Sequence, residues 1–181
     1  MGKRSNGKFR RSKADFYRTQ QDAIPALIQN FSKPVKYIEP CVGNGALIDL
    51  LDNYSFICTG GYDVEYQCDE VKIADATHHK YEMAANEIFI TNPPWTRNLL
   101  HQIIENLSNQ APAWLLFDAD WIHTKQAAPF LCRLVKVVSV GRVEWFAHHH
   151  DSKGVGVDNC AWYLFDKPRA DNIIQFVGRT T

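Results

Sequence analysis

One stretch decides the fold, and it reads Tyr37-Ile38-Glu39-Pro40-Cys41-Val42-Gly43-Asn44-Gly45-Ala46-Leu47. A short apolar strand ends here at an acid, Glu39, and the chain then passes through two glycines into an amphipathic helix. Because glycine adopts backbone angles that other residues avoid, Gly43 and Gly45 let main-chain N–H groups approach an anionic group at the positive end of the helix. The stretch predicts a small-ligand site, although a tight turn without a ligand would carry the same glycines.

The spacing of the glycines indicates which ligand suits the turn. The dinucleotide pattern G-x-G-x-x-G is only half met, because Ile48 occupies the third position. An NAD site is therefore not favoured. Glu39 would repel a phosphate but could hold an ammonium group through a water molecule or an amide. A zwitterionic amino-acid group fits better than a pyrophosphate.

A second stretch, Ile88-Phe89-Ile90-Thr91-Asn92-Pro93-Pro94-Trp95, is another apolar strand, and it stops at Asn-Pro-Pro-aromatic. Two consecutive prolines make the chain rigid at the carboxyl end of this strand. Ligands bind at the carboxyl ends of the strands in open α/β sheets. The two stretches together predict an α/β fold with a site at that edge of the sheet.

The two stretches resemble the class I S-adenosylmethionine-dependent methyltransferases, in the branch that methylates exocyclic amino groups and includes the N6-adenine DNA methyltransferases. Residues 39–45 are similar to the family's cofactor motif, and residues 92–95 to its catalytic motif. The resemblance in element order extends over about residues 14–166. It implies a Rossmann-like fold: a seven-stranded, mostly parallel sheet with an antiparallel terminal hairpin and helices on both faces.

Periodicity predicts the individual elements. Helices are expected over residues 20–31, 44–51, 97–109 and 125–134. Strands are expected over residues 35–39, 56–62, 71–74, 88–91, 114–117, 135–146 and 161–165. Thr19 is a candidate N-cap for the first helix.

The resemblance implies a set of S-adenosylmethionine contacts. Asp63 lies about 20 residues after the glycine turn, at the end of the next strand, where an acid accepts hydrogen bonds from ribose hydroxyls; Glu65 is its competitor. Asp75 would take the adenine amino group and Ala76 a ring nitrogen, although spacing alone indicates only that Asp75 caps a turn. Thr19 belongs to a segment that lines the methionine end in the family, but Gln20 stands where proline is usual. The expected cofactor-binding residues are Thr19, Glu39, Pro40, Gly43, Gly45, Asp63, Val64, Asp75, Ala76 and Asn92.

The expected catalytic residues are Asn92, Pro93, Pro94 and Trp95. An exocyclic amine is a poor nucleophile because its lone pair is delocalised into the ring. The Asn92 side-chain oxygen and the Pro93 carbonyl would accept its hydrogens, and Trp95 would stack on the flat acceptor. Cytosine-C5 methylation needs a thiolate just after the proline pair, where this chain has Trp95.

The acceptor is less well defined than the chemistry. Adenine N6 in DNA is favoured; RNA adenine-N6 and protein glutamine-N5 methylation stay open, as does an idle cofactor-binding or interaction protein with this fold. Residues 1–13 hold six Lys or Arg before the first acid, Asp15, so the 20 basic and 20 acidic residues leave 14 against 20 in the rest of the chain, a net −6. This basic, flexible arm favours contact with nucleic acid, and a solubilising tail is the alternative.

Length and composition bear on the number of domains, the compartment and metal binding. At 181 residues and 45% hydrophobic, we expect one methyltransferase domain over residues 14–181 with no separate target-recognition domain, so a protein partner could supply specificity. The five scattered cysteines suggest buried thiols in a reducing compartment, and no apolar run approaches a membrane span, so a cytoplasmic protein is expected. The run His148-His149-His150-Asp151 is not expected to bind metal, because adjacent histidines cannot converge on one ion. It is a candidate substrate-contacting loop.

Overall fold

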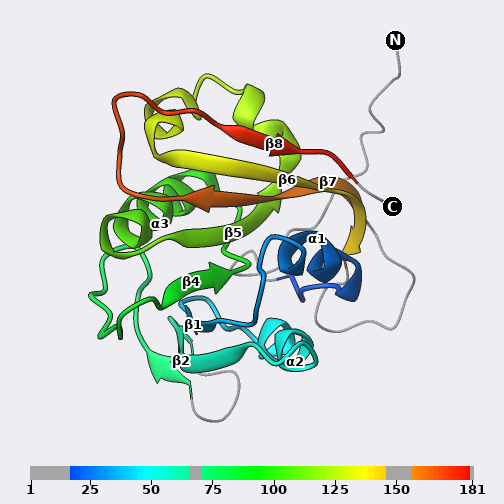
Figure 1. Cartoon of the computed structure of the whole chain (residues 1–181). Coiled ribbons are helices and arrows are strands. Elements are labelled where there is room, and N and C mark those ends of the chain that lie inside the picture. The colour runs from blue at the N-terminus through cyan, green and yellow to red at the C-terminus, as the bar shows by residue number, and fades with distance from the viewer. Residues whose placement is uncertain (1–16, 66–70, 146–155, 180–181) are drawn as a thin grey trace.

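The computed structural model describes residues 17–65, 71–145 and 156–179 (Figure 1). The predicted basic arm at residues 1–13, Cys68 and the His148–His150 loop lie outside the described residues. Alternating apolar side chains build the central strands: Tyr37 faces one side of the sheet and Ile38 the other. Both faces are therefore buried, as in parallel sheets covered by helices.

The described residues form one eight-stranded sheet in the order β3-β2-β1-β4-β5-β7-β6-β8. The strands are β1 Lys36–Glu39, β2 Ile57–Asp63, β3 Lys72–Ile73, β4 Ile88–Thr91, β5 Ala113–Asp118, β6 Leu134–Trp145, β7 Gly156–Phe165 and β8 Gln175–Val177. Only β7 is antiparallel to its neighbours, β5 and β6. The expected parallel sheet with an antiparallel terminal hairpin is thus present.

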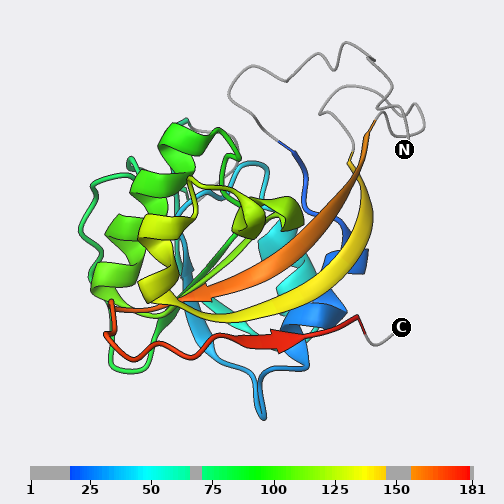
Figure 2. The same ribbon diagram turned by 90° about the horizontal axis from the view of Figure 1, so that it is seen from above.

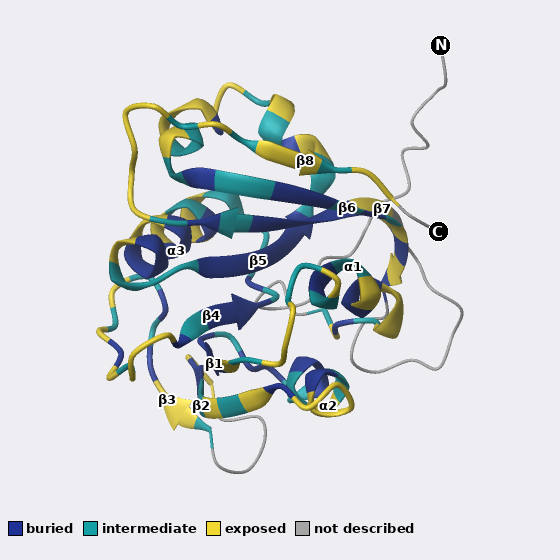
Figure 3. Ribbon diagram, in the orientation of Figure 1, coloured by how far each residue is buried: buried dark blue, intermediate teal, exposed yellow. Residues whose placement is uncertain are grey.

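The expected count of seven strands is wrong by one among the described residues. The additional strand, β8, pairs in parallel with Lys136–Val138 of β6 at the edge of the sheet. It has three residues, and Phe176 is 64% exposed. Such a segment carries no alternation of buried and exposed side chains, so periodicity could not reveal it. Figure 3 shows the contrast between the buried β4 and β5 and the exposed edge strands β3 and β8.

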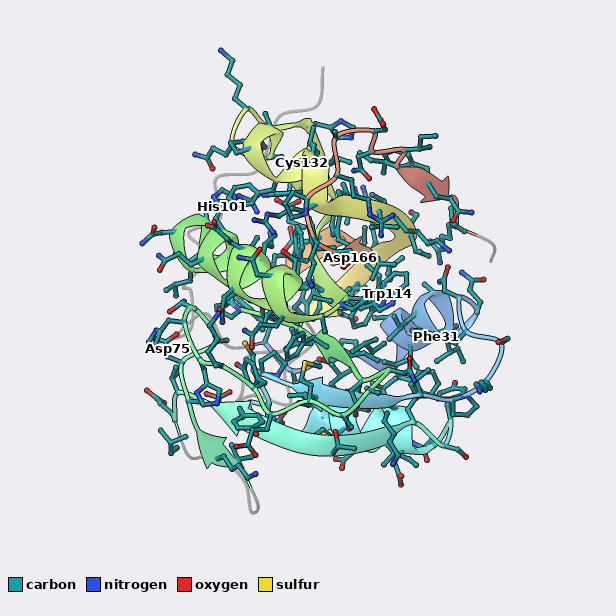
Figure 4. The ribbon with its side chains drawn as sticks, turned by 60° about the vertical axis from the view of Figure 1, so that its left-hand side comes forward. Phe31, Asp75, His101, Trp114, Cys132 and Asp166 are labelled. Atoms are coloured by element: carbon teal, nitrogen blue, oxygen red, sulfur yellow. The ribbon has the colours of Figure 1, made fainter. Side chains whose placement is uncertain are left out.

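Helical segments cover both faces of the sheet (Figure 2). One face carries η2 Gln21–Ala23, α1 Ile24–Ile28 and α2 Ala46–Asp52, and the other carries α3 Arg97–Gln110, η3 Ala119–His123 and η4 Ala128–Arg133. Phe31 and Trp114, labelled in Figure 4, pack with ring centroids 5.9 Å apart where the end of the α1 segment meets β5. None of the described helices is long and apolar enough to cross a membrane.

Two predicted helices are shorter than expected, and proline contributes to each difference. The helix expected over residues 20–31 is a 3₁₀ turn followed by the five-residue α1, which starts beside Pro25 and ends where the Asn30 amide donates to the Ala26 carbonyl. The helix expected over residues 125–134 is only the 3₁₀ segment η4, because Pro129 lacks an N–H and β6 begins at Leu134. Cys132 in this segment is exposed, contrary to the expectation of buried thiols.

Candidate active site

A cavity of about 380 Å³ opens at the carboxyl ends of β1, β2 and β4 and at the loop after β3. Its volume lies within the range of small-molecule pockets, about 300–1,000 Å³. Every predicted site residue lines it except the two glycines. The lining includes Thr19, Glu39, Pro40, Asp63, Val64, Asp75, Ala76, Asn92, Pro93, Pro94 and Trp95. The fold thus brings the two sequence stretches to one cavity.

Gly43 and Gly45 do not themselves line the cavity, whereas Val42 and Asn44 of the same turn do. Gly43 and Gly45 have φ values of 54° and 83°, which glycine adopts at little cost. The Gly43 N–H donates to the Asp63 carboxylate at 2.8 Å, and the Gly45 N–H donates to the Val42 carbonyl at 3.0 Å. Both of these N–H groups are therefore used within the protein.

Asp63 is a fixed acceptor at the end of β2. It is 8% exposed, and besides the bond from Gly43 it accepts the Glu65 N–H at 3.1 Å. Each oxygen of the carboxylate keeps acceptor capacity after one such bond. Glu65 also lines the cavity, but its side chain is exposed and has no comparable anchoring among the described residues. The geometry favours Asp63 as the acceptor for a neutral hydroxyl-bearing group.

Glu39 is the most unusual group in the cavity. It is 1% exposed, and neither carboxylate oxygen has a hydrogen-bond partner among the described residues. Burial, followed by the nearby charge of Asp63, raises the pKa of Glu39 well above its ordinary value. A buried acceptor without a partner is costly, so this carboxyl group suits a ligand that brings a cation or a hydrogen-bond donor.

The charge of the lining excludes one class of ligand. The described lining residues include four acids and no Lys, Arg or His: the acids are Glu39, Asp63, Glu65 and Asp75. A pyrophosphate would meet repulsion here and no compensating cation. The lining therefore disfavours dinucleotides, in agreement with the incomplete glycine pattern, and suits a ligand with an ammonium group and hydroxyls.

Asp75, labelled in Figure 4, caps the turn after β3 as its spacing indicates. It accepts the Thr77 N–H at 2.8 Å and the Thr77 hydroxyl at 2.7 Å. Burial acts to raise the pKa of Asp75, but these two hydrogen bonds and the neighbouring His78 outweigh it, and the pKa is lowered. Asp75 is therefore a carboxylate that lines the cavity while capping the turn.

Asn92 connects the cavity to the N-terminal segment. Its side-chain Nδ2 donates to the Tyr17 carbonyl at 3.0 Å and to the Thr19 hydroxyl at 3.2 Å. Thr19 is not an N-cap, because Gln20 precedes η2 and no side chain caps that turn. The Thr19 hydroxyl instead accepts a hydrogen bond from Asn92, and Thr19 lines the cavity.

Trp95 is held on two sides. Its indole N–H donates to the Leu116 carbonyl at 3.2 Å and contacts Asn92 Oδ1 at 3.4 Å. Its ring meets Trp145 in a T-shaped contact with centroids 5.2 Å apart. Sequence reasoning did not find Trp145, and no local pattern pointed to it, since it is one buried residue near the end of a long strand. Tyr17 belongs to the same N-terminal segment as Thr19, so the family resemblance that indicated Thr19 could also have indicated Tyr17.

None of the described residues that line the cavity is an activated nucleophile. Cys41 lines it, but burial, with the nearby charge of Asp63, raises the pKa of its thiol far above neutrality. A protonated thiol is a poor nucleophile. The arrangement can bind, orient and accept hydrogen bonds, and it has no described group suited to forming a covalent intermediate.

The buried carboxyl of Glu39 predicts a pH-dependent stability change. Below its ordinary pKa of 4.5, the group is neutral in the folded and unfolded chains, so ionisation does not change the free energy of unfolding. As the pH rises toward and through the raised folded-state pKa, the unfolded chain ionises more readily, so the folded state loses stability. Because Gln has no ionisation to suppress, Glu39→Gln should stabilise the free protein at about pH 8, by about 1.4 kcal/mol for each unit by which burial raises the pKa of Glu39, and much less at about pH 5.

Thermal or urea unfolding at the two pH values measures this difference. Glu65→Gln, at an exposed position of the same cavity, is the matched control and should change the free energy of unfolding little. Equal effects of Glu39→Gln at both pH values would show that the carboxyl is not desolvated as described.

Comparison with known proteins supports the fold. No protein-family model and no curated protein matches the chain. Among solved structures, a candidate RNA methyltransferase from Pyrococcus horikoshii aligns with a TM-score of 0.57 at 12% identity, covering 89% of this chain and 92% of its own. The methyltransferase subunit of a type I restriction-modification system from Streptococcus thermophilus aligns with a TM-score of 0.55 at 11% identity, covering 93% and 48%.

The M protein of the type I restriction enzyme EcoKI aligns with a TM-score of 0.51 at 12% identity, covering 84% of this chain and 44% of its own. The chain thus spans about half the length of the two type I subunits. At these identities the likeness concerns the fold alone. The chain has the Rossmann-like methyltransferase fold, with the cavity at the carboxyl edge of its sheet.

Proposed function

We propose that this protein is an S-adenosylmethionine-dependent methyltransferase acting on an exocyclic amino group, with N6 of adenine in DNA as the favoured acceptor. One observation carries the proposal: a single cavity joins an acidic part, containing Glu39 and Asp63, to the Asn92–Trp95 loop. The likeness in fold to type I restriction-modification methyltransferase subunits and to a candidate RNA methyltransferase supports it.

The residues present fit this cofactor. The partnerless carboxyl of Glu39 matches the ammonium of the methionine part, and the anchored carboxylate of Asp63 matches the ribose hydroxyls. Asp75 and Ala76 would hold the adenine ring, as the resemblance implies. When bound, S-adenosylmethionine supplies a methyl group activated by a sulfonium.

The protein's own contribution to the reaction is orientation and hydrogen-bond acceptance. Asn92 Oδ1 and the Pro93 carbonyl would each accept one amine hydrogen, which draws the nitrogen toward tetrahedral geometry and counters the positive charge that develops on it. The proline pair keeps these acceptors at the end of β4. A flat acceptor would stack on Trp95, which lines the cavity and is braced by Trp145.

Charge supports nucleic acid as the acceptor. The six basic residues within positions 1–13 lie four or more residues before Tyr17, whose carbonyl accepts a hydrogen bond from Asn92. The chain therefore enters the described fold beside the proposed acceptor site, and cations just before this point could contact a phosphate backbone. A partner protein that adds target specificity is part of the proposal.

A second acceptor class, the side-chain amide of protein glutamine, is favoured by a different observation. Burial, followed by the charges of Asp118 and Asp120, raises the pKa of Asp158. These carboxylates gather at the end of β5, next to β4 in the sheet. Asp118 is paired with the Arg97 guanidinium, so in the part of the chain that the structure describes the unpaired acidic groups here are Asp120 and Asp158. These two disfavour a polyanion, whereas a planar amide resembles an aminopurine in its delocalised lone pair and brings no phosphates. An acceptor assay decides between the two classes.

Asp63→Ala should weaken S-adenosylmethionine binding by about 1.5–3 kcal/mol, the scale of hydrogen bonds to a charged group. Titration calorimetry measures the change, and thermal unfolding checks that the variant is folded. Glu65→Ala, at an exposed neighbouring position, should leave the affinity nearly unchanged. The opposite ranking of the two variants would move the ribose site to Glu65.

Asn92→Ala should lower turnover about 10²–10³-fold, by analogy with removal of one oxyanion-hole donor, while cofactor affinity largely survives. The assay offers DNA, RNA and a glutamine-containing protein in parallel with labelled S-adenosylmethionine. Mass spectrometry then locates the new methyl group. Methylated glutamine with no labelled nucleic acid would contradict the nucleic-acid assignment, and full turnover by Asn92→Ala would contradict the role of the loop.

Deletion of residues 1–13 should weaken nucleic-acid binding and flatten its dependence on salt concentration, because fewer phosphate contacts release fewer counterions. Fluorescence anisotropy at several salt concentrations measures the slope. Cofactor affinity serves as the internal control and should not change. Identical slopes for the full-length and truncated proteins would assign the arm to solubility alone.

A further inference from the structure

The orientation of the Asn92 amide is set by contacts outside the catalytic loop. We infer that the Tyr17 carbonyl and the Thr19 hydroxyl position this amide so that its oxygen, and not its nitrogen, is left for the acceptor. The inference rests on the proposed function and deepens it, because it favours acceptors that bring a hydrogen-bond donor, such as the N–H of an exocyclic amine. Thr19 is thus assigned as a positioning residue.

Two contacts fix the amide independently of each other. A main-chain carbonyl can only accept, so the Tyr17 oxygen, 3.0 Å away, must face the NH₂ group of Asn92. An indole N–H can only donate, so the Trp95 nitrogen, 3.4 Å away, must face Oδ1. A flipped amide would set oxygen against oxygen on one side and N–H against N–H on the other. The mismatch at the Tyr17 carbonyl would place two acceptors against each other and cost about 1–3 kcal/mol, whereas the Trp95 N–H would keep the Leu116 carbonyl.

The NH₂ group of the Asn92 amide is fully engaged by contacts within the protein. One N–H of Asn92 goes to the Tyr17 carbonyl and the other to the Thr19 hydroxyl at 3.2 Å. Oδ1, by contrast, has two lone pairs, and within residues 17–65, 71–145 and 156–179 it receives only the long contact from Trp95, whose N–H is shared with the Leu116 carbonyl. The group presented to a ligand is therefore an acceptor with spare capacity.

This arrangement selects among acceptor chemistries. An exocyclic amine or a primary amide donates an N–H to Oδ1 and is held. A ring nitrogen without hydrogen, or a thiolate, presents only lone pairs and would face the Asn92 oxygen with no compensating donor. The site therefore favours acceptors that bring a hydrogen, such as the N–H of an amine or amide, over acceptors that bring only lone pairs.

The segment that holds Asn92 is itself anchored. Thr19 is 6% exposed, and the Tyr17 ring meets Trp145 in a T-shaped contact with centroids 6.3 Å apart. Trp145 in turn contacts Trp95. Residues separated by 73 and 75 positions from Asn92 thus meet it across a braced aromatic cluster.

The same geometry explains why the loop needs an amide at position 92. An aspartate there would place a carboxylate oxygen against the Tyr17 carbonyl and lose the donation to that oxygen. Asn92→Asp should therefore be about as inactive as Asn92→Ala, although a carboxylate is the stronger acceptor for amine hydrogens. A loop whose only requirement was an acceptor would tolerate the aspartate.

Steady-state kinetics with S-adenosylmethionine and the best acceptor from the parallel assay test the inference. Thr19→Val, which removes the hydroxyl at nearly constant volume, should lower kcat about tenfold, the worth of one hydrogen bond. Its Kd for S-adenosylmethionine should stay within about twofold of the wild-type value. Thr19→Ser should restore kcat. A loss seen only in cofactor affinity, or wild-type turnover by Asn92→Asp, would overturn the inference.

Side-chain amide exchange measured by NMR gives a readout independent of turnover. Both Nδ2 protons of Asn92 should exchange more slowly than those of the exposed Asn98, and Thr19→Val should remove the protection of one of them. Fast exchange of both protons in the wild-type protein would overturn the inference. If the wild-type protein methylates no acceptor while both protons are protected, the proposed function fails and the amide orientation stands.

Discussion

The hydrogen bond from the Gly43 N–H to the Asp63 carboxylate is the interaction on which the site depends. It ties the turn after β1 to the end of β2 at 2.8 Å, and it requires the positive φ of 54° that glycine supplies. With this bond in place, Glu39 at the end of β1 lies buried beside a second carboxylate. The turn therefore keeps a destabilising buried carboxyl at the cavity, where the proposed function places a positively charged ligand.

The sequence predicted the central architecture because short-range sequence patterns determine that part of the fold. Apolar alternation marks the strands around Tyr37, and the glycine turn and the proline pair mark the ends of β1 and β4. The parts that were wrong lack such signals: β8 is three residues long, and Pro25 and Pro129 limit two segments with helical spacing.

The finer structure of the candidate site could not be predicted for a related reason. The residues that line the cavity follow from strand ends, which sequence can locate. The bonds that orient Asn92 connect it to Tyr17 and Thr19, more than 70 positions away, and Trp145 joins through tertiary packing alone. The use of the Gly43 N–H by Asp63 likewise depends on how two strands meet in space. Long-range contacts of this kind produce no periodic pattern in the sequence.

The central claim is that the acidic cavity binds a cationic amino-acid-bearing cofactor through Glu39. The most direct test is calorimetric titration with S-adenosylmethionine at about pH 6 in two buffers of different ionisation enthalpy. Because burial raises the pKa of Glu39 in the free protein, ionisation of this carboxyl against the ligand ammonium should release a proton. We expect saturable one-to-one binding with proton release that Glu39→Gln abolishes. Absence of binding, or binding whose proton release survives Glu39→Gln, would contradict it.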